Sequence, residues 1–439
     1  MNSRNISNGY SAIFKIEIAK SKDIRIIPAN IHLQKSKDYY RKAINTIIDS
    51  DPIFKCLLWT NYGNVLDHLG RSVESFFAYD RALSYNPKFS MAIANKAEAQ
   101  RGFAEITGTY RAATYINCYQ MIKSVLDKPD LIEYGGQSAH DDFLRKLNII
   151  ESLFKDPASL TKEIKHPPYN FKKHSDFERF YIEYSLDNNL FLNLHIHEGN
   201  CNASVGDPLF ITLITPVDEN NLFYHLSKFI NQIKEDYAVA RLLLIQSQYK
   251  TKDLTKISNL TTFVNTLDYS DFNIYIGLLK SAFKNAYSIL DKISHFLNEY
   301  LNLNILHNIY FTTIWEEKTN NKKSIRNEIM QTENLSLFAL YDIYLDCKSY
   351  YYSKIQDIRN ALMHEKLTVY DSVLTDWDNK DDKYNIGYDS FLSHTLILFN
   401  VVRASIFYLI NFVYQNEKKK YPDDVGLIVP QYVDTTQFI

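Results

Sequence analysis

The stretch SKIQDIRNALMHEKLTVY, residues 353–370, carries the most informative pattern in the chain and is predicted to be a helix. It lies in a region that has no proline between positions 216 and 422 and only two glycines, Gly277 and Gly387. Because proline and glycine disfavour helix interiors, this composition indicates long uninterrupted helices. Residues 265–420 are therefore predicted to form a helical bundle.

Further segments of this region support the bundle. Apolar side chains recur at helical spacing in Ile289–Leu301 and again in Leu337–Leu345. Residues 390–414 supply a last helix, and a polar loop over 371–389 separates it from the helix over 353–370. Four helices with such a loop make a compact bundle.

The last of these helices contains a long apolar run, Leu396–Tyr414, with Arg403 at its midpoint. Because an arginine at the centre of a membrane span is costly, we expect a buried core helix here. The N-terminal residues Met1–Tyr10 are polar and contain no apolar stretch of a signal peptide. The four cysteines are far apart and fit no zinc or redox spacing, so a cytoplasmic location is expected.

Three residues within the quoted stretch, Arg359, Asn360 and His364, are suited to metal-free RNA cleavage. RNA is cut when its own 2′-hydroxyl attacks the adjacent phosphate, and histidine is the natural base or acid near neutral pH. Arginine binds a phosphate with a planar, permanently charged fork. On a helix Asn360 and His364 are four residues apart and share a face, and the long side chain of Arg359 can reach forward to them.

These residues resemble the motif of the HEPN superfamily (higher eukaryotes and prokaryotes nucleotide-binding). That family is marked by an Arg, four to six residues and a His, usually with a polar residue directly after the Arg, within an all-helical bundle. The resemblance implies an endoribonuclease that needs no metal or other cofactor and leaves a 2′,3′-cyclic phosphate and a 5′-hydroxyl. It also implies a homodimer through the C-terminal bundle, with two motifs forming one composite cleft, and isologous dimers are the commonest assembly.

Residues Trp59–Pro87 resemble a tetratricopeptide repeat. Gly63 and Ser75 allow two helices to approach closely, Tyr79 fills the groove with Trp59, and Pro87 ends the second helix. One repeat cannot bury its own face, so residues 30–127 are predicted to be a short helical solenoid. Its concave surface either binds a peptide, protein or RNA partner or serves only as a scaffold. The combination of such repeats with the HEPN motif resembles one bacterial HEPN subgroup, which implies a defence or toxin-type effector.

The middle of the chain has a different pattern. Leu192–His197 alternates apolar and polar residues, which predicts a strand. His195, His197 and Cys201 have a spacing that also occurs among metal ligands, but no fourth ligand is near in sequence. We therefore favour exposed strand histidines, with a metal at His195 and His197 as the alternative.

Other residues near the motif are candidates for RNA contacts. A basic stretch that includes Lys322, Lys323 and Arg326 can follow a phosphate backbone, and Tyr351 can stack on an unpaired base. The alternatives are a solvated loop for the basic stretch and ordinary helix packing for the tyrosine. The formal net charge of the chain is −2, so any RNA site must be a local patch.

The sequence thus predicts a mainly α protein with a small mixed α/β middle segment. Its main function is predicted to be endoribonuclease activity, and the alternative is a non-catalytic RNA- or protein-binding HEPN and repeat scaffold. The predicted divisions are an N-terminal segment over 1–29, helical repeats over 30–127, a mixed region over 128–264, a HEPN bundle over 265–420 and a tail over 421–439.

Overall fold

The computed structural model divides the chain into two compact units. The first comprises Met1–Pro167 with His197–Gly199 and Glu333–Ala339, and the second contains the rest. The tail over 421–439 and most of the polar loop over 371–389 lie outside the described residues. The residues that the structure describes are 2–46, 51–107, 111–162, 167–198, 201–210, 222–319, 322–371 and 384–420.

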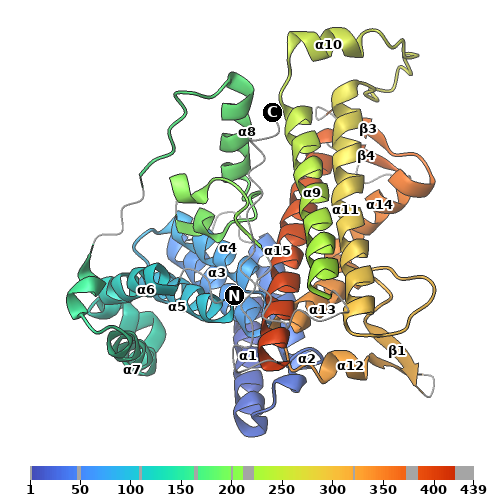
Figure 1. Cartoon of the computed structure of the whole chain (residues 1–439). Helices are drawn as coiled ribbons and strands as arrows, with labels where there is room; N and C mark the ends of the chain where they lie inside the picture. Colours follow the sequence, from blue (N-terminus) through green and yellow to red (C-terminus); the bar gives the residue numbers. More distant parts are fainter. Residues whose placement is uncertain are drawn as a thin grey trace. The chain divides into compact units, whose positions relative to one another are not determined.

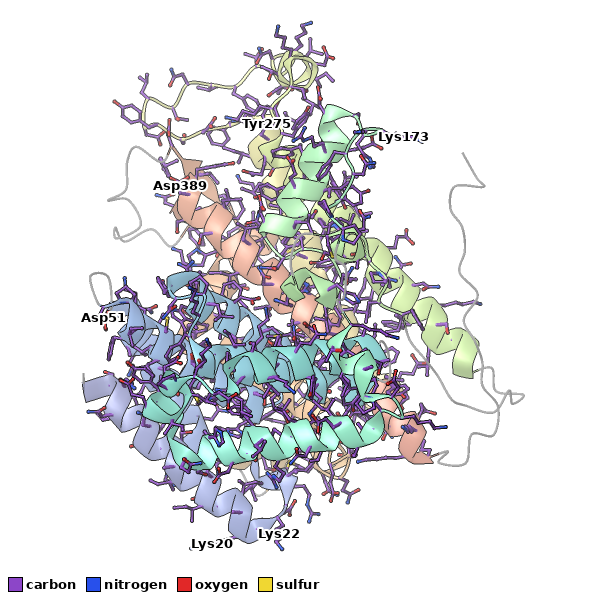
Figure 2. All side chains as sticks on the ribbon, turned by 90° about the vertical axis from the view of Figure 1, so that its left-hand side faces the viewer. Lys20, Lys22, Asp51, Lys173, Tyr275 and Asp389 are labelled. Atoms are coloured by element: carbon purple, nitrogen blue, oxygen red, sulfur yellow. The ribbon has the colours of Figure 1, made fainter. Side chains whose placement is uncertain are left out.

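The first unit is built from helices that each pack on the next one along the chain, as expected for a helical repeat region. Side chains fill the space between its ribbons, and Lys20 and Lys22 lie at the C-terminal end of the first helix (Figure 2). Its helices are α1 (Asn2–Ser21), α2 (Ile31–Thr46), α3 (Pro52–His68), α4 (Ser72–Tyr85), α5 (Ser90–Thr107), α6 (Arg111–Leu126) and α7 (Pro129–Leu153), with the 3-10 turns η1 (Ile24–Ile26) and η2 (Pro157–Thr161).

The hairpin of α3 and α4 shows why the repeat pattern folds as it does. The ring of Tyr79 is buried against Gly63, where an added Cβ would lie only 2.6 Å from the ring. A glycine at this position therefore allows the two helices to approach closely. The helical hairpin is as expected, while its membership of the tetratricopeptide class stays a prediction.

The second unit is also mainly helical (Figure 1). Helix α13 (Leu335–Lys348) begins in the first unit and ends in the second. The 3-10 helix η3 (Leu194–Glu198) begins in the second unit and ends in the first. The remaining elements are α8 (Asp176–Asp187), η4 (Asn202–Ser204), α9 (Leu222–Gln248), α10 (Lys252–Ser258), α11 (Ile274–Tyr300), β1 (Glu316–Thr319), β2 (Lys322–Ile325), α12 (Asn327–Met330), η5 (Tyr350–Tyr352), α14 (Ser353–His364), β3 (Thr368–Tyr370), β4 (Asn385–Gly387) and α15 (Tyr388–Lys420).

Helix α11 is the centre of this unit. It begins at Asn273, whose side chain accepts a hydrogen bond from the backbone N–H of Ile276, as an N-cap residue does. It packs against α9, α14 and α15, which lie around it in Figure 1. Aromatic rings fill the contact with α15, where Tyr300 meets Phe412 edge to face. The apolar stripe predicted from the sequence is thus the side that α11 buries.

Helix α15 is a core helix. It is long and apolar enough to cross a membrane, but 83% of its apolar window is buried inside the protein. Arg403 is buried within it, and its guanidinium donates hydrogen bonds to the carbonyls of Phe191 (2.7 Å) and Asn193 (2.9 Å). These bonds compensate the desolvation of the charge, which is why the helix tolerates an arginine at its midpoint.

The strand predicted over Leu192–His197 is wrong. The chain forms the 3-10 helix η3 there, and the described part of the middle region contains no strand longer than an isolated bridge. The side chain of Asn193 accepts a hydrogen bond from the backbone N–H of His195 (3.0 Å), which closes a local turn. Asparagine side chains compete with extended structure in this way, and here they override the alternating pattern.

The helix predicted over residues 353–370 ends earlier than expected, at His364. The following residues form β3, which pairs in parallel with β4, so that Val369 lies opposite Ile386 and both are buried. The Nζ of Lys280 on α11 also donates a hydrogen bond to the carbonyl of Leu367 (2.6 Å). Tertiary pairing therefore stops α14 and leaves His364 as its last residue.

Candidate active site

Helix α14 presents one buried and one exposed face. Ile355, Ile358 and Ala361 are buried, at a spacing that places them on the side facing the bundle. Asn360 and His364 lie on the other side and are exposed, while Arg359 is half-buried between the two faces. The packing of α14 therefore holds the motif rigidly while leaving its polar ends accessible to a ligand.

The structure brings the three motif side chains together. Nη1 of Arg359 donates a hydrogen bond to Oδ1 of Asn360 (3.1 Å) and lies 3.4 Å from Nε2 of His364. The guanidinium thus reaches forward along the helix to the imidazole. Among the residues that the structure describes, Arg359 has no carboxylate in a salt bridge. Its charge is available for an external anion such as a phosphate.

Helix α11 contributes a tyrosine ring that contacts the arginine. The guanidinium of Arg359 lies over the ring of Tyr287, 5.5 Å from its centroid, a geometry that favours a cation–π contact. The hydroxyl of Tyr287 is 2.9 Å from the side-chain nitrogen of Gln356, one turn earlier on α14. Burial raises the pKa of Tyr287, so its hydroxyl stays neutral and acts in positioning.

The charge of this arginine also acts on the carboxyl group of Asp291. Burial raises the pKa of Asp291. Three effects lower it: a hydrogen bond from the backbone N–H of Phe311 (2.9 Å) and the charges of Arg359 and His295. Sequence reasoning missed Tyr287 and Asp291 because both lie on α11, far from the motif in sequence. Their only signal was a four-residue spacing on one helix face, which cannot show what packs against it.

The other predicted RNA-contacting residues lie on separate elements. Lys323 is exposed on β2, and the side chain of Lys322 lies outside the described residues. Arg326 donates a hydrogen bond to the carbonyl of Ile314 (2.8 Å) and pairs with Glu317, so its guanidinium helps to hold the chain. Tyr351 is exposed just before α14, and its ring packs against that of Tyr352. Their role in RNA binding stays a prediction.

The histidines of the middle region have other partners. Nδ1 of His197 lies 2.7 Å from Oδ2 of Asp80, and the side chain is buried. The sulfur of Cys201 lies 3.4 Å from the hydroxyl of Ser204. Within the described parts of the chain, no three His, Cys, Asp or Glu side chains gather as a metal site requires.

Comparison with known proteins identifies a family for residues 218–416. A family model described as LA2681-like HEPN matches residues 218–416. This match supports HEPN superfamily membership for residues 218–416. The matched region of the HEPN domain begins before α9, includes the motif on α14 and ends within α15. The HEPN resemblance seen in the sequence is therefore confirmed.

Membership also limits the function. HEPN domains are generally ribonucleases or bind RNA, so the family supports a nuclease or RNA-binding class for this domain. Comparison with curated proteins and with solved structures gives no match. The residues of the HEPN domain itself must therefore carry any finer assignment.

Proposed function

We propose that the protein is a metal-independent endoribonuclease whose cutting site contains Arg359, Asn360 and His364. One observation carries this proposal: an exposed imidazole lies 3.4 Å from a guanidinium that has no salt-bridge partner in the described structure. A base or acid and a phosphate-binding cation are the two groups that the reaction needs, because RNA supplies its own nucleophile.

The reaction follows from these groups. The imidazole of His364 accepts the proton of the ribose 2′-hydroxyl, and the oxygen attacks the adjacent phosphorus. A bond forms between the 2′-oxygen and phosphorus, and the bond from phosphorus to the 5′-oxygen of the next nucleotide breaks. The guanidinium of Arg359 binds the charged phosphoryl oxygens, with Asn360 accepting one of its hydrogen bonds and orienting it. The leaving 5′-oxygen takes up a proton.

A second copy of the chain completes this site. One motif contains a single histidine, whereas the reaction uses one group that removes a proton and another that donates one. In a twofold dimer through the C-terminal bundle, His364 of the partner subunit protonates the leaving oxygen. The exposed face of α14 makes such pairing sterically feasible, and an isologous contact brings identical residues together.

The test uses the full chain incubated with mixed RNA in excess EDTA. We expect cleavage by the unmodified protein, with 2′,3′-cyclic phosphate and 5′-hydroxyl ends, and a loss of about 10²–10⁴-fold in His364→Ala. The matched control is His307→Ala, because His307 is another exposed histidine of the second unit and lies outside the motif. Equal behaviour of wild type and His364→Ala would support a binding scaffold and contradict the enzyme.

For the cellular role we propose a bacterial defence or toxin-type effector that acts in the cytoplasm. The support is the combination of an accessible RNA-cutting motif with a helical repeat region, whose surface suits the choice of a substrate or a trigger. Controlled expression in bacteria measures this directly. Growth should stop with the unmodified chain and continue with His364→Ala at equal protein level, and arrest by both would contradict a role based on RNA cleavage.

A further inference from the structure

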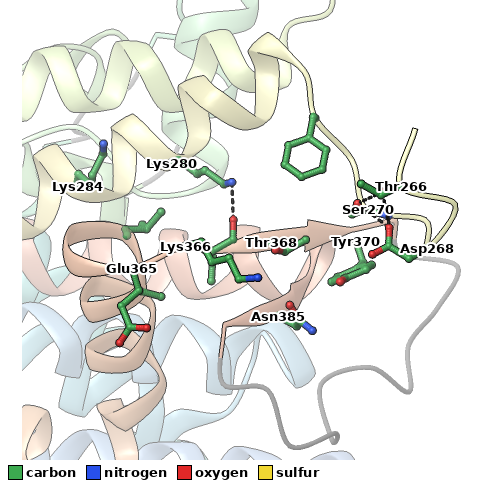
Figure 3. A pocket seen from close by; sticks show the side chains of 14 residues that line it. Thr266, Asp268, Ser270, Lys280, Lys284, Glu365, Lys366, Thr368, Tyr370 and Asn385 are labelled. Atoms are coloured by element: carbon green, nitrogen blue, oxygen red, sulfur yellow. Dashed lines mark hydrogen bonds between the residues drawn. The ribbon is translucent and has the colours of Figure 1, made fainter. Parts of the chain in front are cut away.

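A cavity of about 560 Å³ lies beside the C-terminal end of α14. Its walls are α11, the last turn of α14 and the pair of β3 and β4, and the loop over Thr266–Phe272 closes one end (Figure 3). Ala361 and Leu362 of the motif segment contribute to its lining. Ligand pockets in proteins commonly have volumes of ~300–1,000 Å³, so a single nucleotide fits this space.

Three lysines line this cavity without an acidic partner. Lys280 and Lys284 are four residues apart on α11, and Lys366 follows α14. None of the three forms a salt bridge with any residue that the structure describes. The ammonium of Lys280 uses one hydrogen bond on the carbonyl of Leu367 and has two further donors. Burial lowers the pKa of Lys280, and the charge of Lys284 lowers it further. A bound anion would therefore stabilise the charged form of Lys280.

The carboxylates of the cavity do not cancel these charges. Oδ1 of Asp268 accepts hydrogen bonds from the side chains of Thr266 and Ser270, which hold the pKa of Asp268 at about 2. In Figure 3 Asp268 lies with Thr266 and Ser270 at the opposite end of the cavity from Lys280 and Lys284. Glu365 is the remaining carboxylate, so the part of the cavity beside α11 is basic.

Exposed aromatic rings accompany the lysines. Phe272 lines the cavity and is 42% exposed, and its ring stacks on that of Phe263 at 6.2 Å between centroids. Tyr269, in the same loop, is 72% exposed. A basic surface combined with exposed aromatic rings is the usual arrangement for binding unpaired nucleotides, because phosphates pair with cations and bases stack on rings.

Helix α11 contributes residues both to the cavity and to the candidate active site. Lys280, Lys284, Tyr287 and Asp291 follow one another at spacings of four, three and four residues and therefore share one helix face. Tyr287 supports Arg359. By the helical rise, the two lysines lie about 5 and 10 Å along the axis from that tyrosine. A strand whose phosphate contacts Arg359 can therefore place its neighbouring nucleotide in the cavity.

We propose that this cavity is a subsite for an unpaired nucleotide of the RNA strand next to the scissile phosphate, with its phosphate bound by Lys284, Lys366 and Lys280 and its base against Phe272. This assignment rests on the proposed ribonuclease function, because it takes RNA as the ligand of the motif. It adds a reason why single-stranded RNA is selected: a paired nucleotide cannot present its base face to a ring.

The first test measures binding of a labelled single-stranded RNA by fluorescence anisotropy, with His364→Ala as the non-cleaving background of the full chain. We expect the double substitution Lys284→Glu and Lys366→Glu to weaken binding about tenfold or more and to reduce the salt slope by about one to two. The matched control has the same charge change at two other exposed lysines of the second unit, Lys228→Glu and Lys418→Glu. Equal weakening by both pairs would overturn the subsite, because it would show only a general charge effect.

Two single substitutions test the cavity in opposite directions. Glu365→Gln removes a carboxylate from its lining and is expected to tighten RNA binding severalfold, while Phe272→Ala removes the ring and is expected to weaken it about tenfold. Glu365 and Phe272, like Lys284 and Lys366, are exposed, so the melting temperatures of all these variants should stay close to that of the background protein. Unchanged binding by Phe272→Ala and Glu365→Gln would contradict the assignment.

A free nucleotide presents the same chemistry as a nucleotide of the strand, so competition separates the two sources. A nucleoside monophosphate should displace the labelled RNA only weakly, since it lacks the contacts at the motif. Tight binding of the monophosphate that depends on the lysines and leaves the labelled RNA in place would overturn the subsite in favour of an effector pocket. RNA that binds through the cavity but is never cut by the unmodified chain would instead refute the ribonuclease and leave the subsite supported.

Discussion

His364 is a candidate catalytic residue and His197 a candidate metal ligand, and the two side chains differ in exposure and in the charge of their neighbours. His364 is exposed at the end of α14, and its Nε2 lies 3.4 Å from Nη1 of Arg359. His197 is buried in the first unit, where Nδ1 contacts Asp80 at 2.7 Å and its ring packs on Phe76. Asp80 in turn pairs with Lys96 at 2.6 Å.

The difference shows what makes a histidine available for catalysis. A carboxylate partner and burial fix the orientation of His197, which suits a structural contact between polar groups in a folded unit. A neighbouring cation and solvent access leave His364 free to exchange a proton with a ligand and place a phosphate-binding group beside it. The same residue type therefore stabilises the fold in one place and is a candidate catalyst in the other.

The largest effect that separates the two environments is expected for Arg359→Lys. Lysine keeps the charge but lacks the planar fork, so it cannot hold the phosphoryl oxygens and the side chain of Asn360 together. We expect a loss of about 10²–10³-fold in cleavage rate under saturating RNA, with the melting temperature nearly unchanged. The control is Arg179→Lys, an exposed arginine of α8 paired with Glu183. A variant that retains more than half of the activity would show that charge alone suffices.

A subunit-mixing experiment asks whether the accessible histidine needs its symmetry mate. The unmodified chain is equilibrated with a ninefold excess of His364→Ala chain, so that about nine in ten of its subunits are in mixed dimers. We expect cleavage per unmodified subunit to fall about tenfold, because a mixed dimer lacks one of the two imidazoles. Unchanged activity per unmodified subunit would show that each motif works alone.

An effect smaller than that of Arg359→Lys should follow from Tyr287→Leu, which removes the ring in contact with the guanidinium of Arg359. A partly buried cation–π contact contributes about 1–2 kcal/mol, which corresponds to a loss of about 5- to 30-fold in cleavage. Tyr287→Phe keeps the ring and loses only the hydroxyl contact with Gln356, so its activity should stay close to that of the unmodified chain. Equal losses in both variants would assign the effect to the hydroxyl and contradict a positioning role for the ring.

Much of the fold can be predicted from local pattern. The apolar stripes of α11, α13 and α15 and the scarcity of proline and glycine are properties of single helices, so the sequence alone predicts them. The motif on α14 was also predictable, since Arg359, Asn360 and His364 lie within six residues and their reach depends only on helix geometry.

Features that depend on tertiary contacts could not be predicted. The end of α14 at His364 depends on the pairing of β3 with β4 and on the bond from Lys280 to Leu367, which join distant parts of the chain. The cavity lysines are likewise separated by 82 positions between Lys284 and Lys366. The 3-10 turn at Asn193 depends on a side-chain bond that an alternating pattern does not encode.

Asp80→Asn is expected to leave RNA cleavage unchanged and to lower the stability of the fold instead. Burial alone would raise the pKa of Asp80, but its hydrogen bond with His197 and the charges of His197 and Lys96 outweigh it and lower the pKa below the ordinary value. A carboxyl with a depressed pKa stabilises the fold above its unfolded pKa of about 4 and loses that contribution as the pH falls through the folded value. Asparagine has no such charge, so the variant should melt about 2–8 °C lower than the unmodified chain at pH 7, and the gap should narrow towards pH 3. RNA cleavage at a temperature well below both transitions should be unchanged, and a parallel loss of cleavage would mean that His197 takes part in the chemistry after all.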